Sequence, residues 1–249
     1  APQRVNAALD FKGSLMRWLV VMTALALGPA AFAADCVVLL HGLGRTSHSM
    51  ARLENAMLKA GYNVVNEGYP SRKKSVNELI QVVEDGVDKC REFGARRINF
   101  VTHSLGGILV RAYFQDQAVA EAGRVVMLAP PNHGSEIADA YAGRWWYRLF
   151  TGPAGQELGT GPNGVAQSLD EIPIEVGVIA GTKSIDPWFA SVMPKPNDGK
   201  VSVESAKLAE MRDFITVPYT HTFMARRESV ASQVLLFLSE GRFDHGVGG

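Results

Sequence analysis

The sequence has few cysteines and no surplus of charge of either sign. Two cysteines among 249 residues are too few for a disulfide-dense scaffold or for a zinc cluster with four ligands. Basic and acidic side chains are equal in number, 25 of each, so there is no overall basic excess for binding nucleic acid. The chain is also unlike a disordered protein, because 47% of its residues are hydrophobic and only 20% are charged. Its length fits one α/β domain or two small ones.

Residues 1–33 have the features of a secretory signal peptide. A basic segment precedes the apolar run 18–27, and the small residues Ala31 and Ala33 stand at positions −3 and −1 of a cut before Ala34. The apolar run is short and ends in a Gly-Pro pair, which is not typical of a transmembrane helix. The sequence therefore predicts a secreted or periplasmic protein that is cleaved near Ala33-Ala34.

A buried N-terminal helix is the alternative interpretation of this segment, and Met16 is an alternative start, with residues 1–15 as an upstream extension. Without residues 1–33, the remaining 216 residues carry 22 basic and 24 acidic side chains, a net charge of −2. That length is sufficient for one well-buried core, so residues 34–249 are expected to form a single domain.

Short apolar runs alternate with helical patterns along residues 34–249. The runs predict six strands, at 36–40, 62–69, 98–102, 124–129, 175–180 and 214–217. Helical spacing of apolar residues predicts helices over 47–60, 75–94, 105–114 and 230–238. Strands separated by helices indicate a mainly parallel sheet with helices on both faces. Residues 135–172 are rich in glycine and aromatics and break this alternation, so we expect them to form a small cap or lid.

Ser104 lies where a predicted strand runs directly into a predicted helix, in Phe100-Val-Thr-His-Ser-Leu-Gly-Gly107. A sharp turn at this place projects a serine hydroxyl above the sheet and needs small neighbours, as in the pattern G-x-S-x-G. Gly106 fits the pattern, whereas Thr102 replaces its first glycine. A helix N-cap is the alternative role for such a serine. The strand context favours a nucleophile.

His41-Gly-Leu-Gly44 directly follows the first predicted strand. Acyl transfer needs two backbone N–H groups to stabilise the oxyanion, one usually from the residue after the nucleophile and one from a glycine-rich loop. Leu105 and Leu43 occupy these two positions. A structural turn is the alternative reading of the His-Gly segment. Together with Ser104, the two leucines are predicted to form the oxyanion hole.

With these motifs the chain resembles the α/β-hydrolase family, and within it the bacterial triacylglycerol lipases and carboxylesterases. The resemblance extends from Cys36 to about Phe243. Three further segments carry it, namely Ala129-Pro-Pro-Asn-His-Gly-Ser135, Thr151-Gly-Pro-Ala-Gly-Gln156 and Asn197-Asp-Gly-Lys-Val-Ser-Val-Glu-Ser205. The family implies an α/β-hydrolase fold and the chain order nucleophile, acid, histidine.

This order places the catalytic histidine at His221, just past the last predicted strand. A serine is a poor nucleophile until a histidine, oriented by a carboxylate, accepts its proton. His41 and His103 flank the two site motifs and are expected to do structural work. A surface histidine is the alternative for His221.

Two aspartates are candidates for the acid. Asp198 begins a segment that resembles the Asp-Gly-x-Val of related lipases, and we favour it. Asp186 is nearer the end of the fifth predicted strand and remains the alternative. Both lie in ordinary turn sequences. Asp170 precedes the fifth strand and fits poorly.

No metal or organic cofactor is expected. Calcium-binding lipases usually carry an acidic residue two positions after the histidine, where this chain has Phe223. Cys36 and Cys90 fall at the same end of neighbouring elements, where either a disulfide or two buried thiols would serve stability. The aromatic cluster at 145–150 would either line an acyl pocket or pack the cap against the core.

These features predict a secreted serine hydrolase that cleaves carboxylic esters through Ser104, His221 and Asp198. The expected partner is a small-molecule ester or lipid, with transient contact at a lipid interface, and neither nucleic acid nor a stable protein partner is inferred. An amidase or thioesterase using the same residues is the alternative function. A silent binding protein on the same fold is a third hypothesis.

Overall fold

The computed structural model describes residues 34–185, 189 and 192–247. The predicted signal peptide, residues 1–33, lies outside the described residues. Six strands form one parallel sheet in the order β2-β1-β3-β4-β5-β6. The strands are β1 (Cys36–Leu40), β2 (Asn63–Glu67), β3 (Ile98–His103), β4 (Ala122–Leu128), β5 (Glu175–Gly181) and β6 (Asp213–Val217). The predicted parallel sheet is thus confirmed.

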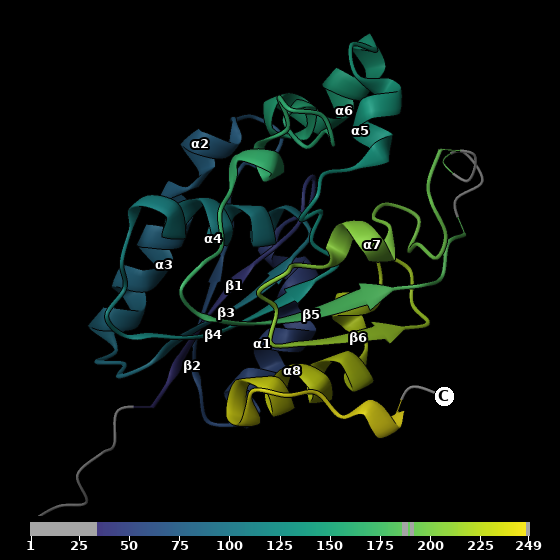
Figure 1. The fold of residues 1–249 in the computed structure, drawn as a ribbon. Coiled ribbons are helices and arrows are strands. Elements are labelled where there is room, and N and C mark those ends of the chain that lie inside the picture. The colour runs from purple at the N-terminus through teal and green to yellow at the C-terminus, as the bar shows by residue number, and fades with distance from the viewer. Residues whose placement is uncertain (1–33, 186–188, 190–191, 248–249) are drawn as a thin grey trace, which may run out of the picture. The chain divides into compact units, whose positions relative to one another are not determined.

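Helices follow most strands and cover both faces of the sheet (Figure 1). The α-helices are α1 (Ala51–Lys59), α2 (Val76–Leu79), α3 (Gln81–Glu92), α4 (Leu105–Asp116), α5 (Glu136–Tyr141), α6 (Trp145–Gln156), α7 (Val203–Ala206) and α8 (Glu228–Glu240). Short 3-10 helices are η1 (Ser47–Met50), η2 (Val165–Ser168), η3 (Met224–Arg226) and η4 (His245–Val247). Helices α3 and α4 pack on one face, and α1 and α8 pack on the other.

Strand β1 shows how the sheet creates two cores. Its side chains alternate between faces, so Val38 and Leu40 join the cluster under α3 and α4, while Val37 and Leu39 join the cluster under α1 and α8. Because both faces are covered, all five residues of β1 are fully buried. A run of apolar residues without alternation is therefore the correct signature of this strand.

Several predicted boundaries differ from the structure. The helix expected over 75–94 is divided at Ile80 into α2 and α3, although its start at Ser75 has the predicted capping box with Glu78. Strand β4 ends at Leu128, one residue earlier than predicted, because Ala129 has a positive φ of 44°. The segment 62–69 is extended only over Asn63–Glu67.

Residues 135–172 contain α5, α6 and η2. Helices α5 and α6 lie above α4, on the side of the sheet where the strands have their carboxyl ends (Figure 1). Helix α6 changes direction at Gly152, whose φ of 66° lies in the left-handed region. A Cβ atom there would collide with the backbone carbonyl of Arg72, so only glycine allows this close approach.

The buried Arg111 of α4 ties both ends of the cap to the core. Its Nη1 donates to the carbonyl oxygen of Asn132 at 3.0 Å, and its Nη2 donates to that of Leu169 at 2.8 Å. Asn132 precedes the cap and Leu169 lies near its end, so one guanidinium holds the two together.

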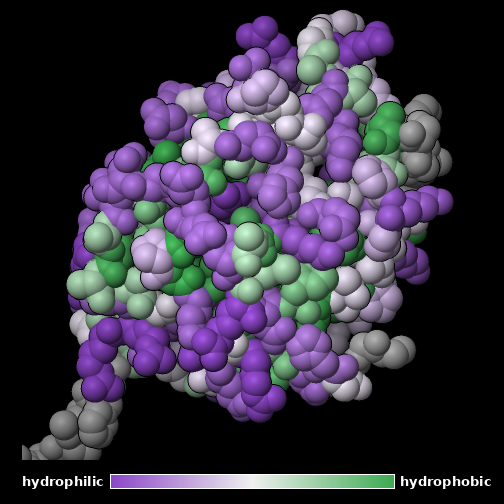
Figure 2. All heavy atoms as spheres, viewed as in Figure 1, coloured by the Kyte–Doolittle hydropathy of each residue, from purple (hydrophilic) through white to green (hydrophobic). Residues whose placement is uncertain are grey.

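Cys36 of β1 and Cys90 of α3 form a disulfide, with their Cα atoms 5.7 Å apart. The bond lies at the amino-terminal end of β1, opposite the end that leads to His41. Within the described residues, no helix has the length and apolarity needed to cross a membrane. Hydrophilic residues predominate on the face shown in Figure 2, with hydrophobic residues in smaller groups among them.

Candidate active site

Ser104 occupies a strained turn between β3 and α4. Its φ of 55° and ψ of −120° are unusual for a residue with a side chain, and such strain is typical of functional sites. The Ser104 N–H donates to the Leu128 carbonyl at 2.8 Å, and the Ser104 carbonyl accepts from Gly107 N–H at 2.9 Å. The hydroxyl makes no capping hydrogen bond to α4, which argues against the N-cap alternative.

Close backbone packing explains the small residues around Ser104. A Cβ atom on Gly106 would lie 2.7 Å from the Leu40 carbonyl oxygen, and one on Gly42 would lie 3.1 Å from the Ser104 Cβ. Thr102, which replaces the usual first glycine, is fully buried inside β3 and pairs with Leu40 and with a residue of β4. At that place the backbone is an ordinary strand, so a β-branched residue fits.

Asp198 and His221 form a buried pair. The His221 Nδ1 atom lies 2.7 Å from Asp198 Oδ2, and the Asp198 side chain is fully buried. The second carboxylate oxygen, Oδ1, accepts from the N–H groups of Lys200 at 2.9 Å and Val201 at 2.8 Å. His221 N–H also donates to the Asp198 carbonyl at 3.0 Å. These contacts fix the carboxylate, which in turn fixes the imidazole with Nε2 available for chemistry.

Gly181, the last residue of β5, allows the two loops to meet. A Cβ atom on Gly181 would lie 2.7 Å from the Asp198 Cβ and 2.5 Å from the Tyr219 carbonyl oxygen. The loops that carry Asp198 and His221 therefore pack directly on the end of β5. Asp186, the alternative acid, lies outside the described residues.

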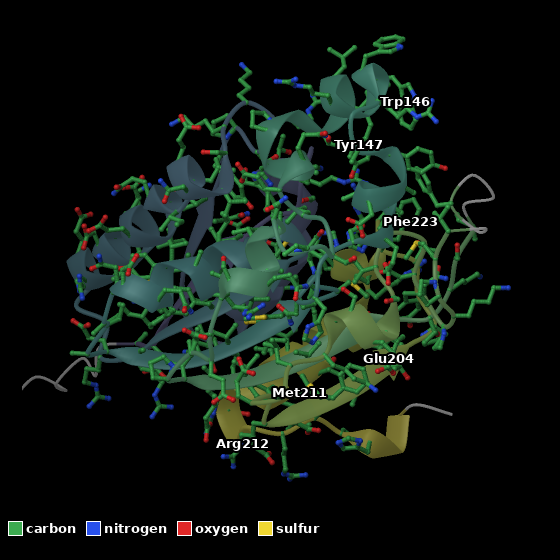
Figure 3. All side chains as sticks on the ribbon, turned by 45° about the horizontal axis from the view of Figure 1, so that its top comes forward. Trp146, Tyr147, Glu204, Met211, Arg212 and Phe223 are labelled. Carbon is green, nitrogen blue, oxygen red and sulfur yellow. A yellow bond between two sulfur atoms is a disulfide. The ribbon has the colours of Figure 1, made fainter. Side chains whose placement is uncertain are left out.

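Ser104 and His221 line one cavity of about 360 Å³. Ser104 is 8% exposed and the His221 side chain is 12% exposed, so both are largely shielded from solvent in the wall of this cavity. The cap supplies much of its wall, and Trp146 and Tyr147 extend from α6 (Figure 3). The other cap residues in the wall are Ser135, Ile137, Phe150, Thr151 and Leu158.

The aromatic cluster of the cap both lines the cavity and packs the cap against the core. Trp146, Tyr147 and Phe150 line the cavity, and Tyr147 is also buried against the core. Tyr141 contacts Trp146 with ring centroids 5.2 Å apart, which packs α5 against α6. The cavity thus has an apolar wall made by the cap.

Leu43 lies in a turn at the edge of the same cavity. The Arg45 N–H donates to the Gly42 carbonyl at 3.1 Å, and Gly44 has a φ of 67°, as the third position of a type II turn requires. Within the described residues, the N–H groups of Leu43 and Leu105 donate to no other protein group. Leu105 begins α4, where the helix dipole favours negative charge.

His41 supports this turn. Its ring stacks on Tyr69 with centroids 4.0 Å apart, its Nδ1 donates to the Gly42 carbonyl at 2.9 Å, and its Nε2 accepts from Tyr69 N–H at 3.3 Å. Burial lowers the pKa of His41, which favours the neutral ring that this pattern needs. These contacts agree with the structural role that the sequence predicts for His41.

His103 connects the serine turn with the histidine loop. Its Nε2 lies 3.0 Å from the His221 carbonyl oxygen, and the two rings are 4.7 Å apart. A carbonyl oxygen only accepts, so Nε2 carries the proton. Burial holds the pKa of His103 well below its usual value, and the nearby His221 lowers it further.

Sequence reasoning missed Arg45 and Thr222. Both line the cavity, and Arg45 Nη2 donates to Thr222 Oγ1 at 3.0 Å. The available signal was a cation immediately after the glycine-rich turn. No group of three or more histidine, cysteine or acidic residues in the described part of the chain is arranged to hold a metal ion.

Six parallel strands, a strained serine turn after β3, and an acid–histidine pair from the loops after β5 and β6 give this chain the α/β-hydrolase fold. Among similar solved structures is the mature form of a Bacillus licheniformis lipase, BlEst2, with a TM-score of 0.65 and 23% identity over 82% of this chain and 89% of that one. Against the propeptide form of that lipase, at 24% identity and a TM-score of 0.65, the match covers 76% of this chain but only 47% of the other.

A metagenomic carboxyl esterase, MGS0156, is similar with a TM-score of 0.60 and 18% identity, over 77% of this chain and 65% of that one. A phospholipase from Legionella pneumophila, PlaB, is similar with a TM-score of 0.62 and 19% identity, over 83% and 58% of the two chains. No protein-family model and no curated protein sequence matches the chain. The structural likeness establishes the fold.

Proposed function

We propose that the protein is a serine hydrolase that cleaves carboxylic esters. The observation that carries this proposal is that His221, held by a 2.7 Å hydrogen bond to the buried Asp198, lines the same cavity as the strained Ser104. A serine, a histidine and a carboxylate in this order along the chain are the groups that acyl transfer requires. The lipases and esterases among the structural neighbours support an ester as the substrate.

In this mechanism Ser104 Oγ attacks the ester carbonyl carbon, and His221 Nε2 accepts the hydroxyl proton. Asp198 holds the imidazole and stabilises its protonated form, while the N–H groups of Leu43 and Leu105 bind the oxyanion. The tetrahedral intermediate collapses, His221 gives its proton to the leaving alcohol, and an acyl-enzyme remains. Water activated by His221 then attacks the acyl group, releases the acid and restores Ser104.

Labelling with a fluorophosphonate tests the nucleophile. We expect the wild type to be labelled and Ser104→Ala to remain unlabelled, with an unchanged melting temperature as the control for folding. Labelling of Ser104→Ala would contradict the proposal. A set of nitrophenyl esters of increasing acyl length, compared with a matched acyl amide and thioester, separates an esterase from an amidase or thioesterase.

Transient contact with a lipid surface is part of the proposal. Trp145, Leu149 and Phe150 of α6 are 77%, 69% and 63% exposed, and helical spacing places the first two on one face of the helix. Arg144 and Arg148 flank them and are also exposed. An apolar face bordered by cations suits an anionic lipid surface. The same helix lines the cavity, so such contact would bring lipid to the candidate site.

Sedimentation with vesicles of anionic and neutral phospholipid tests this contact. We expect Leu149→Ser to reduce binding to anionic vesicles several-fold. Leu58→Ser is a matched control. Leu58 is also an exposed leucine, at 51%, but it belongs to α1, which packs on the face of the sheet opposite α3 and α4. Equal loss in the two variants would contradict a role for α6.

Export from the cytoplasm, to the periplasm or the medium, is also proposed. The Cys36–Cys90 disulfide supports it, since such bonds persist mainly in oxidising compartments. Mass spectrometry of the exported protein should find Ala34 as its first residue, and Ala33→Arg should block that cleavage. Recovery of uncleaved protein from the cytoplasm alone would contradict this proposal.

A further inference from the structure

Arg45 is a half-buried cation in the wall of the cavity that contains Ser104 and His221. It closes the turn that carries Leu43, through the hydrogen bond from its N–H to the Gly42 carbonyl. Its side chain lines the same cavity as Ser104 and His221, and its guanidinium reaches Thr222, the residue after His221. Arg45 has no role in the proposed mechanism of ester cleavage.

The side-chain partner of Arg45 is neutral. Its Nη2 donates to Thr222 Oγ1 at 3.0 Å. Among the described residues, no carboxylate forms an ion pair with Arg45, whereas the partly buried Arg124 is paired with Glu175 at 2.6 Å. A guanidinium has five N–H donors, and Thr222 uses one of them. The others are available to a ligand in the cavity.

Arg45 faces no acidic group in the described wall of the cavity. Of the described residues that line the cavity, none is acidic. The nearby Asp198 is fully buried, and its carboxylate is already bonded to His221 and to two backbone N–H groups. Because charges act more strongly away from water, an anion in this cavity would be attracted to Arg45.

Thr222 directly follows His221, which gives its proton to the leaving alcohol in the proposed mechanism. Because Arg45 is hydrogen-bonded to this neighbour of His221, the inference assigns the alcohol part of the ester to Arg45. The apolar wall made by Ile137, Trp146 and Tyr147 belongs to the cap and suits the acyl chain. The alcohol part of the ester would thus contact a cation, and the acyl chain would contact the apolar wall of the cap.

We propose that Arg45 binds an anionic group, phosphate or carboxylate, carried by the alcohol part of the ester. Guanidinium pairs with both anions through parallel N–H···O bonds. Holding the anion would place the leaving oxygen near His221 Nε2. The inference rests on the proposed ester hydrolysis and specifies its substrate class.

Three butyrate esters test the inference, with glycerol, glycerol 3-phosphate and glycerate as alcohols, measured by butyrate release. We expect wild type to have the higher kcat/KM on one or both anionic esters. Arg45→Gln should lower the ratio of kcat/KM on the anionic ester to that on the glycerol ester about tenfold or more, because a charge-assisted hydrogen bond is lost. Arg45→Lys should retain part of the ratio, and the larger effect between phosphate and carboxylate identifies the anion.

Arg72→Gln is the matched control. Arg72 is exposed, its Cδ would lie 3.5 Å from a Cβ on Gly44, and it does not belong to the described lining of the cavity. Its substitution removes a positive charge near the same turn and should leave the ratio within about twofold, because exposed charges are screened. Rising salt should reduce the wild-type ratio, which supplies a measurement that needs no variant.

The outcomes separate the inference from the function on which it rests. A wild type that cleaves the glycerol ester with no preference for either anionic ester overturns the role of Arg45 alone. An equal fall on all three esters in Arg45→Gln overturns it as well, since that result indicates positioning through Thr222. A wild type that releases butyrate from none of the esters overturns the proposed function and this inference together.

Discussion

The imidazole of His103 donates a hydrogen bond to the backbone carbonyl of His221 across 3.0 Å. The residue before the candidate nucleophile thereby holds the loop that carries the candidate base. The bond is shielded from solvent, because His103 is only 3% exposed. The position of His221 relative to Ser104 thus depends on the His103 side chain and the His221 backbone.

Replacing His103 by leucine should remove this bond and lower kcat by about tenfold, since small displacements of a catalytic group reduce its rate. His103→Gln retains a donor that can reach the same carbonyl and should recover part of the loss. Steady-state kinetics on a nitrophenyl ester, with thermal unfolding of each variant, make the comparison. Equal kcat in His103→Leu and wild type would show that the bond has no influence on positioning.

Asp198→Asn should reduce kcat by about a thousandfold or more, because an amide cannot hold the histidine in the correct tautomer or stabilise its protonated form. Asp186→Asn should keep most of the activity. The same ester assay measures both variants. Activity retained in Asp198→Asn and lost in Asp186→Asn would transfer the acid to Asp186.

Stability should fall in mild acid because of His103. Its pKa is lowered by burial, with His221, Arg45 and His41 as the charged or titratable groups that lower it further. Below about pH 6.5, His103 is therefore protonated in the unfolded chain but stays neutral in the folded protein. The free energy of unfolding consequently decreases as pH falls through this range. The loss is at most about 1.4 kcal/mol per pH unit for one group.

Urea unfolding between pH 5 and pH 8 measures this effect. His103→Gln should make the free energy of unfolding less dependent on pH. His48→Gln, at an exposed position, serves as the control and should leave the dependence unchanged. The same slope in wild type and His103→Gln would refute the assignment.

Reduction of the Cys36–Cys90 disulfide should destabilise the protein without inactivating it. The bond joins residues separated by 54 positions, and closing a loop of this size contributes about 2–4 kcal/mol. It lies at the end of β1 away from His41, so kcat should stay within about twofold of the wild-type value under conditions where the fold persists. Unfolding of wild type and of a Cys36→Ala, Cys90→Ala double variant, with the ester assay as control, makes the test. A large fall in kcat at full folding would contradict it.

The fold was largely predictable because buried strands such as β1 read as short apolar runs between helical patterns. The division of 75–94 at Ile80 was not predictable, since the apolar spacing continues across it. Ser104 was predictable from a strand that meets a helix. Arg45 was missed because its side-chain partner is Thr222, which is distant in sequence and close only in the folded chain.

The choice between Asp198 and Asp186 shows the same limit of local patterns. Both stand in turn sequences, and the sequence favoured Asp198 only through its resemblance to an Asp-Gly-x-Val segment. Asp198 reaches His221 because Gly181 lets two loops pack on the end of β5. That packing joins segments that the sequence presents separately.

The Arg111 guanidinium has a consequence for the attachment of the cap. It holds the segments at the start and the end of the cap through backbone carbonyls, at Asn132 and Leu169, so these two contacts do not depend on the side chains of those residues. Loss of this one side chain would therefore remove an attachment at both ends of the cap at once. The wall that the cap gives to the cavity depends in part on a single residue of α4.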